Sequence, residues 1–452
     1  MKNFKKNLVL VITSLCLILS GCAHGEDAPV DRPTENTPVV VPEENTSEKT
    51  AAVSEKTDAS RQETASDTAS ETVSQTFSET ADETVSEKAE VTAAPVSQTA
   101  AESQKPQTTA AETAAAVQTE KAPAPSDGIW DVISNMSLEE KVGQIILVRY
   151  SAETAAKASQ YHFGGYTLYA ADFADETPES IQAKLAKIKS NSVIPPFFAA
   201  DEEGGQVIRI SKYAAFSDAP LPAIGSSAAK SDIKGFAEKM AQILKKGGVN
   251  LNLAPVADVA ESEEDYIYGR TCMADYDETG EIIGALVTEL NSRNVVSCLK
   301  HFPGYGSNVD THTGIAVDNR TAESFESKDF IPFKAGIRAN VPMIMVNHNI
   351  VTAYNDKVPA SLAPEVHSTL RALGFNGVIV TDDLGMGAIL QYSDSPYADA
   401  VLAGNDLLCT SDGEACYKAV YDAAKSGVIS EERLDESVYR ILSLKKRYGI
   451  LS

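Results

Sequence analysis

Four apolar runs of the sequence end in side chains that could act as acids, bases or nucleophiles. In chain order, the residues that follow these runs are DEEGGQ (201–206), Lys300 with His301, Asn347-His348-Asn349, and Thr381-Asp382-Asp383. Any one of these groups alone would be read as a charged loop in solvent. Four runs that end in this way predict one polar pocket, and Asp258 adds an acid after a fifth run. Carboxylates and imidazoles gathered in a pocket can transfer protons or form covalent intermediates.

The surrounding sequence has the pattern of alternating strands and helices. Eight short apolar runs recur, at roughly 143–148, 164–169, 196–200, 249–256, 295–299, 341–346, 377–380 and 406–409. Runs that are apolar throughout, separated by amphipathic segments such as Ile233 to Lys246 and Tyr276 to Arg293, indicate a parallel sheet covered by helices. The pattern predicts one α/β domain, a (β/α)8 TIM-type barrel over residues 128–452. In such barrels the reacting groups lie beyond the C-terminal ends of the strands.

Both ends of this domain carry helix signals. Ser137 and Glu140 have the spacing of a capping box ahead of an apolar stretch, which predicts a helix start. A last helix, from near Ser430 to Lys446, would close the ring. A doubly wound open sheet is the main alternative, and the absence of a Gly-x-Gly-x-x-Gly after the first strands makes it less favoured.

The N-terminus has the features of an export signal. Three lysines precede an apolar run from Leu8 to Leu19, which is too short to cross a bilayer as a mature helix. The run ends in Leu19-Ser20-Gly21-Cys22, which resembles the lipobox of bacterial lipoproteins. We therefore expect residues 1–21 to be a signal peptide and Cys22 to be acylated, so that the protein is extracytoplasmic and lipid-anchored to the cell membrane.

Residues 22–127 are rich in Ala, Thr, Ser and Glu and are predicted to be a disordered tether. Such a composition cannot bury enough apolar surface to offset the entropy of ordering. Residues 24–127 hold 21 acidic and 7 basic residues, and this segment accounts for much of the formal net charge of −25. The acidic balance argues against nucleic-acid binding, which rests on Lys and Arg. A mucin-like binding stalk is the alternative for this segment.

The domain also resembles a known family. It is similar to the family 3 glycoside hydrolases and, within them, to bacterial β-N-acetylglucosaminidases of the NagZ type. The matching stretches are DEEGGQVIR (201–209), NLAPVADV (252–259), YGR (268–270), KHFPGYGSNVDTH (300–312) and RALGFNGVIVTDDLGM (371–386). The resemblance implies a retaining exo-β-N-acetylglucosaminidase that removes terminal β-linked N-acetylglucosamine, with peptidoglycan fragments as the expected source.

The same resemblance implies catalytic roles. Asp382 would be the nucleophile that forms a glycosyl-enzyme, whereas the residues alone leave Asp382 and Asp383 nearly equal candidates. Asp310 and His312 would form an acid/base dyad. The imidazole has an unperturbed pKa of about 6.5, so it can exchange protons near neutral pH, and the aspartate would fix its tautomer.

For substrate binding, the resemblance implies that Asp201, Arg270, Lys300 and His301 hold the sugar hydroxyls. His348 is expected either to line the pocket or to serve in packing. Tyr305 departs from the His or Arg that commonly follows KHFPG in the family, which leaves the contacts of that position open. We expect no cofactor, no metal and a monomer. Cys272, Cys298, Cys409 and Cys416 have no metal-ligand spacing, and the sequence gives no basis for pairing them.

Four alternatives remain at this point. They are another family 3 β-glycosidase, an N-acetylglucosaminide phosphorylase, a metal-dependent barrel hydrolase and a non-catalytic wall-binding protein. Phosphate could replace water in the second step, because a neutral His repels it less than a carboxylate would. The candidate ligands for a metal would be His301, His312, His348, Asp310 and Asp382, but neither a His-x-His after the first strand nor a His-Glu-x-x-His is present.

Overall fold

The computed structural model describes residues 128–308, 316–385 and 389–452. The predicted signal peptide, the acylated Cys22 and the tether lie outside the described residues. So do Asp310 and His312. Among the described residues, no helix is both long enough and apolar enough to span a membrane.

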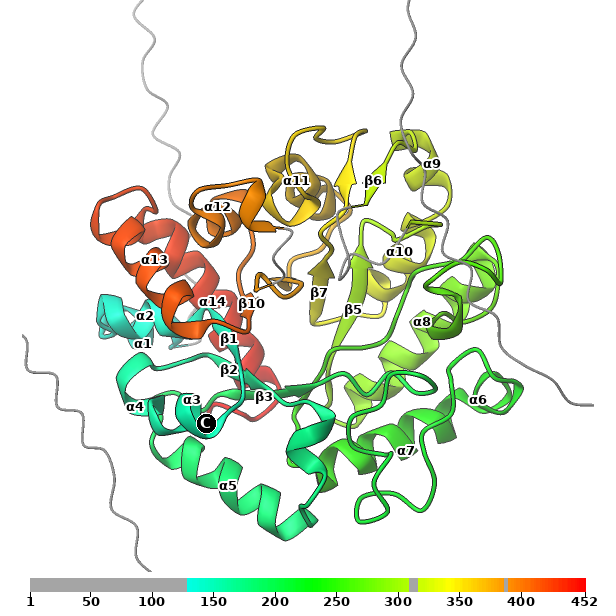
Figure 1. Ribbon diagram of the computed structural model, residues 1–452, viewed down its shortest axis with the longest axis horizontal. Coiled ribbons are helices and arrows are strands. Elements are labelled where there is room, and N and C mark those ends of the chain that lie inside the picture. The colour runs from blue at the N-terminus through cyan, green and yellow to red at the C-terminus, as the bar shows by residue number, and fades with distance from the viewer. Residues whose placement is uncertain (1–127, 309–315, 386–388) are drawn as a thin grey trace, which may run out of the picture. The chain divides into compact units, whose positions relative to one another are not determined.

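Eight parallel strands form a ring in the described part of the chain (Figure 1). In chain order they are β1 (Ile146–Arg149), β2 (Gly165–Thr167), β3 (Phe197–Ala200), β4 (Leu251–Asn252), β5 (Val296–Phe302), β7 (Met343–Val346), β9 (Val378–Thr381) and β10 (Leu408–Thr410). β1 pairs with β10 as well as with β2, and a bridge between Val380 and Leu407 joins β9 to the start of β10. The predicted α/β barrel is thus confirmed as a nearly closed ring.

Helices surround this ring on its outer face (Figure 1). They are α1 (Ile129–Ser134), α2 (Leu138–Gln144), α3 (Ala152–Ala156), α4 (Ala158–Tyr161), α5 (Pro178–Ser190), α6 (Ser227–Ser231), α7 (Ile233–Lys246), α8 (Tyr276–Ser292), α9 (Ala322–Ser327), α10 (Phe330–Arg338), α11 (Pro364–Ala372), α12 (Pro396–Ala403), α13 (Gly413–Lys425) and α14 (Glu431–Arg447). Short 3-10 turns are η1 (Ala170–Phe173), η2 (Tyr268–Arg270), η3 (Ala360–Leu362) and η4 (Ile389–Gln391).

Local sequence signals account for several of these elements. The predicted capping box is present at α2, where the Ser137 hydroxyl accepts from the Glu140 N–H and the Glu140 carboxylate accepts from the Ser137 N–H. The strands are buried on both faces because helices cover them outside and side chains fill the barrel inside. Helix α7 has the predicted bounds, and α8 ends one residue earlier than expected.

Three predicted strands have bounds that differ from the structure by three or more residues at one end, and one of them, predicted over 249–256, is only β4 (Leu251–Asn252). The first begins at Ile146 rather than Gly143, because the helix that the capping box starts continues to Gln144. The fifth continues past Leu299 to Phe302, so Lys300 and His301 lie within β5 instead of after it. Both side chains pair with carboxylates, and this pairing allows polar side chains inside a buried strand.

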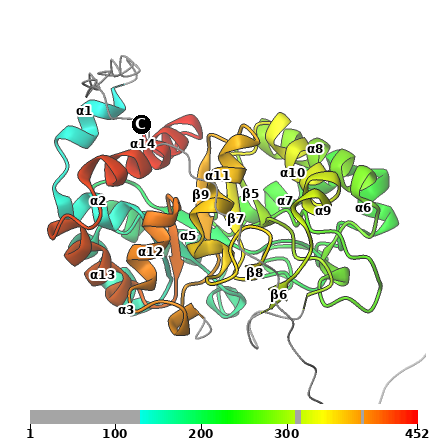
Figure 2. The same ribbon diagram turned by 90° about the horizontal axis from the view of Figure 1, so that it is seen from above.

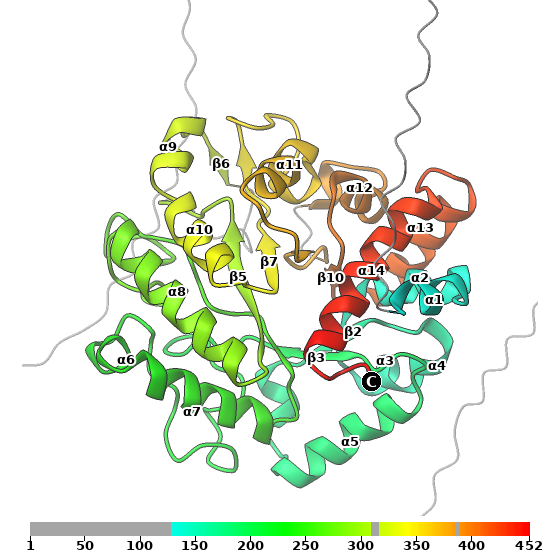
Figure 3. The same cartoon turned by 180° about the vertical axis from the view of Figure 1, so that it is seen from behind.

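The two ends of the barrel differ in what covers them (Figure 2). β6 (Val317–Asp318) pairs with β8 (Ile350–Val351), which directly follows β7, so this small sheet lies at the C-terminal end of the strands. Helix α1 lies beside α14, where the Trp130 ring stacks on Tyr439 with centroids 4.9 Å apart (Figure 3). The four cysteines of the domain are buried and unpaired by disulfides.

Candidate active site

A cavity of about 730 Å³ opens at the C-terminal end of the strands. Its wall comes from segments that follow β2, β3 and β4 and from the ends of β5, β7, β9 and β10. The cavity is lined by several ionisable side chains, namely Asp201, Glu203, Arg209, Arg270, Lys300, His301, Asp382 and Asp383. The cavity is therefore the polar pocket that the strand endings predicted.

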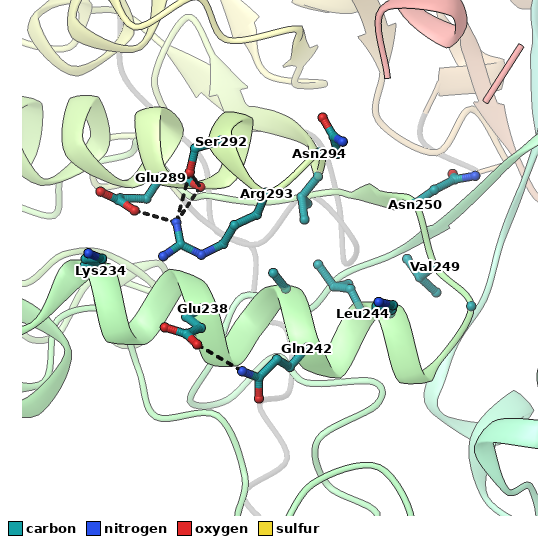
Figure 4. Close-up of a pocket in the computed structure, with 14 residues that line it drawn as sticks. Lys234, Glu238, Gln242, Leu244, Val249, Asn250, Glu289, Ser292, Arg293 and Asn294 are labelled. Carbon is teal, nitrogen blue, oxygen red and sulfur yellow. Dashed lines mark hydrogen bonds and ion pairs between the residues drawn. The ribbon is translucent and has the colours of Figure 1, made fainter. Parts of the chain in front are cut away.

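A second cavity, of about 930 Å³, lies between α7 and α8 (Figure 4). It is lined by Asn250 and Val295, which precede β4 and β5, so it lies toward the opposite end of these strands. Its carboxylates are engaged along their own helices, Glu289 with Arg293 and Glu238 with Gln242. It does not bring together acids and bases from several strands, and we place the candidate active site in the smaller cavity.

Two buried cations organise the acids of the active-site cavity. The Lys300 Nζ lies 2.7 Å from both the Asp201 Oδ1 and the Glu203 Oε1. Arg270 donates from Nε and Nη2 to the two oxygens of Glu203, at 2.9 and 2.8 Å. These contacts connect β3, η2 and β5 in one charged network. The ion pairs of this network hold the N–H donors of Lys300 and Arg270 in fixed positions at the cavity wall.

The network also sets the protonation of its members. Burial raises the pKa of Asp201, but Lys300 and Arg209 lower it more strongly, to about 2. Burial likewise opposes ionisation of Glu203, yet the charges of Lys300 and Arg270 hold its pKa below the usual value. The pKa of Lys300 is raised because Asp201 and Glu203 outweigh the effect of burial. All three groups are therefore charged at neutral pH.

His301 is oriented by a buried carboxylate. Its Nδ1 lies 2.6 Å from the Asp258 Oδ2, and its Nε2 lies 3.3 Å from the Arg270 Nη2. A guanidinium can only donate, so Nε2 accepts and Nδ1–H donates to Asp258. The same aspartate accepts from the backbone N–H groups of His301 and Tyr305. Asp258 thus supports the site from behind, with its side chain fully buried.

Asp382 and Asp383 have different surroundings, which distinguishes the two candidates. The Asp383 Oδ1 accepts from the N–H groups of Gly385 and Ser411. Asp382 directly follows β9, and its Oδ1 accepts the N–H of Asp383 at 2.8 Å. Burial raises the pKa of Asp382, but the electrostatic effects of His348 and His301, the hydrogen bond from the Asp383 N–H and the charge of Lys300 outweigh burial and hold the pKa below its usual value. The site therefore holds an ionised carboxylate at Asp382.

His348 lies beside the cavity rather than in its lining. It is 1 % exposed, its Nδ1 is 2.8 Å from the Ser361 hydroxyl and its Nε2 donates to the Asp383 carbonyl at 3.2 Å. These contacts hold the peptide that follows the Asp382 carboxylate. Of the two roles expected for His348, the described contacts correspond to packing and positioning.

The segment that was predicted to carry the acid/base dyad is described only at its two ends. Arg320 donates to Asp318 and Asp329, and its Nη2 is 3.3 Å from the Gly304 carbonyl oxygen. Asn308 also donates to Asp318. Arg320 therefore ties the start of this segment to its end. Glycine is favoured at position 306, because its φ of 59° is in the left-handed region and a Cβ there would also lie 2.7 Å from the Arg320 guanidinium.

The structure brings together most of the predicted site residues. Asp201, Arg270, Lys300, His301 and Asp382 all line one cavity. Sequence reasoning did not single out Glu203, Arg209 or Tyr169. Two signals were available: Glu203 follows soon after the run that ends at Ala200, and both Glu203 and Arg209 belong to the stretch DEEGGQVIR (201–209). Among the described residues, no group of three or more His, Cys, Asp or Glu is arranged to hold a metal ion.

Comparison with known proteins identifies the family. The profile described as "Glycosyl hydrolase family 3 N terminal domain" matches residues 137–444. The chain belongs to glycosyl hydrolase family 3. Within this family it is 29% identical over 334 residues to "Beta-hexosaminidase A" of Pseudoalteromonas piscicida, with 65% of this chain and 55% of that protein covered.

Two further relatives are similar over comparable lengths. "Beta-hexosaminidase LpqI" of Mycobacterium tuberculosis is 27% identical over 330 residues, with 69% of this chain and 83% of that protein covered. A solved family 3 β-N-acetylglucosaminidase from Paenibacillus sp. is 27% identical and superimposes with a TM-score of 0.64, covering 70% of this chain and 63% of that one. The chain thus spans little more than half the length of the Pseudoalteromonas relative.

Proposed function

We propose that this family 3 protein is a retaining exo-β-N-acetylglucosaminidase. The observation that carries the proposal is the ionised Asp382 carboxylate in a cavity whose wall holds Asp201, Lys300 and Arg270 as a fixed charged network. A retaining glycosidase needs such a carboxylate to attack the anomeric carbon. The names of the Pseudoalteromonas and Paenibacillus relatives support N-acetylhexosaminides as substrates.

In the proposed mechanism, an oxygen of Asp382 attacks the anomeric carbon while the leaving oxygen takes a proton from His312. The glycosyl-enzyme is then hydrolysed by a water that His312 deprotonates, with Asp310 holding the imidazole. The roles of Asp310 and His312 rest on the sequence resemblance.

The charged network suits the binding of a neutral polyol. Lys300 and Arg270 can donate to sugar hydroxyls, and Asp201 can accept from two of them. Because Asp201 and Glu203 neutralise the two cations, the cavity has no large excess of positive charge that would favour an anionic sugar at this position. This balance suits a neutral terminal sugar, a class that includes N-acetylglucosamine.

We further propose peptidoglycan fragments as the source of the substrate and lipid anchoring at Cys22 as the location. Both proposals rest on the N-terminal sequence, which resembles a lipoprotein signal. Expression of the full-length chain and of Cys22→Ala, followed by membrane fractionation, tests the anchor. Wild-type protein should sediment with membranes and the variant should not; equal membrane association of the two would contradict acylation.

A product assay tests the activity itself. The full-length protein is incubated with a panel of nitrophenyl glycosides and muropeptides, and the anomeric configuration of the first-formed sugar is followed by proton NMR. We expect release of β-N-acetylglucosamine with retention, with the same product in phosphate buffer as in phosphate-free buffer. A sugar 1-phosphate product would show a phosphorylase, loss of activity with EDTA would show a metal enzyme, and no release from any glycoside would leave a binding protein.

A further inference from the structure

One aromatic side chain stands at the mouth of the active-site cavity. Tyr266 lines the cavity and is 42 % exposed, and it is the only aromatic residue among the exposed large apolar side chains of the described chain. The other lining aromatic residue in the described chain is Tyr169. The guanidinium groups of Arg149 and Arg209 lie 4.4 and 5.7 Å from the centroid of its ring.

The position of Tyr266 is fixed by its neighbours on both sides. Ile267 is fully buried against Val256 and Tyr305. Asp265 accepts from the N–H groups of Glu261 and Ser262, which holds the preceding turn. Tyr266 is thus presented at the mouth by a loop that is anchored before and after it.

A series of rings runs from the wall of the cavity to this residue. The His301 ring lies 5.8 Å from the Tyr305 ring, and the Tyr305 ring lies 6.0 Å from the Tyr266 ring, tilted by 40°. Tyr305 is 3 % exposed, so it lies beneath Tyr266 rather than in the cavity. The unusual residue after KHFPG therefore supports the aromatic side chain at the mouth.

We propose that Tyr266 forms the subsite for the sugar on the leaving-group side of the cleaved bond. The inference rests on the proposed exo-glycosidase activity. An exo-enzyme holds the terminal sugar at the inner end of its pocket, here beside Asp382, so the next sugar lies toward the mouth. A pyranose has an apolar C–H face that packs against an aromatic ring, which makes Tyr266 the platform for that sugar.

Kinetics on two glycosides of the full-length protein test this subsite. One is a β-1,4-linked N-acetylglucosamine disaccharide, and the other is methyl β-N-acetylglucosaminide, whose leaving group is too small to reach the mouth. For Tyr266→Ala we expect kcat/KM on the disaccharide to fall about tenfold, mainly through KM. The methyl glycoside should change by less than about twofold. Tyr266→Phe, which keeps the ring, should stay within about twofold of wild type on both.

The matched control is Tyr421→Ala, which truncates a partly exposed tyrosine on the outer helix α13 and should leave both substrates unchanged. Equal losses on the two substrates for Tyr266→Ala, or a Tyr266→Phe variant as impaired as Tyr266→Ala, would overturn the subsite. If the wild-type protein cleaves neither glycoside, the proposed function itself fails and the subsite falls with it.

Discussion

Arg270 and Glu203 face each other across the wall of the cavity and are joined by two nearly parallel hydrogen bonds of 2.9 and 2.8 Å. The Glu203 side chain is 2 % exposed. It also lies 2.7 Å from the Lys300 Nζ, so a single carboxylate balances two cations. Lys300 and Arg270 are thereby kept in place for substrate by a residue that need not touch the substrate itself.

The first prediction concerns this carboxylate. Glu203→Gln keeps the shape of the side chain but removes the charge that balances Arg270 and Lys300. We expect the free energy of unfolding to fall by about 3 kcal/mol, as for other broken buried pairs, and KM to rise. Urea unfolding and steady-state kinetics measure the two effects. Glu289→Gln, at a more exposed pair with Arg293 on α8, should cost less than about 1 kcal/mol; equal losses in the two variants would contradict the role of Glu203.

The second prediction separates the two adjacent aspartates. Asp382→Asn should lower kcat by at least about a thousandfold, because an amide is a poor nucleophile and a poor leaving group. Asp383→Asn should keep much more activity, since an amide oxygen can still accept from the N–H groups of Gly385 and Ser411. Nitrophenol release measures both. The assignment is wrong if Asp383→Asn is the more impaired variant.

The third prediction concerns pH. Asp382 has a lowered pKa, so it stays ionised until the pH falls below the usual range of an aspartate, and activity should persist into mildly acidic solution. If His312 protonates the leaving group, kcat/KM should decline as the pH rises through about 6.5. His312→Ala should slow turnover more than about tenfold and abolish this decline. A pH profile of the variant that keeps the decline would assign it to another group.

The fourth prediction concerns a lysine buried at the opposite end of the barrel from the active site. Lys445 of α14 is fully buried, with its Nζ 2.8 Å from the Gln144 Oε1 and 5.0 Å from the centroid of the Phe197 ring. Burial lowers its pKa to about 7, well below that of a lysine in the unfolded chain. The unfolded state therefore binds more protons between these two values, and stability should rise with pH above about 7.

Thermal unfolding between pH 6 and pH 9 measures this effect. We expect Lys445→Met, which fills the same space without a charge, to be more stable than wild type at pH 6 and to lose this pH dependence. The decisive observation is whether the stability of the wild-type protein, relative to Lys445→Met, rises or stays constant as the pH increases. A stability difference between wild type and Lys445→Met that does not change with pH through this window would show that Lys445 stays charged in the folded protein.

Much of the fold could be predicted because its signals are local. The eight strands are runs of apolar residues, and the start of α2 is fixed by the contacts between Ser137 and Glu140. The extent of β5 could not be predicted, because Lys300 and His301 look like strand terminators until their partners are known. Those partners, Asp201 and Asp258, are distant in sequence and meet them only in the closed barrel.

The candidate site, like the fold, could be predicted only in part. The strand endings indicated which residues share the pocket, but three adjacent acids in DEEGGQ (201–206) gave no indication of their separate tasks. In the structure Asp201 lines the cavity with Lys300, and Glu203 pairs with Arg270. Glu202 is fully buried and accepts from the backbone N–H groups of Arg209, Ile210 and Ser211. The role of each of these three acids depends on the direction in which its side chain points after the end of β3. That direction could not be read from the sequence.

The pairing of β1 with β10 has a consequence for the order in which the chain can fold. Leu147 is the register partner of Cys409, more than half the chain away. Until residues 408–410 have been synthesised, β1 has β2 on one side and an unpaired edge on the other. Closing the ring must therefore wait for nearly the whole polypeptide, and such long-range pairing is slow. We expect chains truncated before β10 to expose this edge and to aggregate rather than to form a smaller stable barrel.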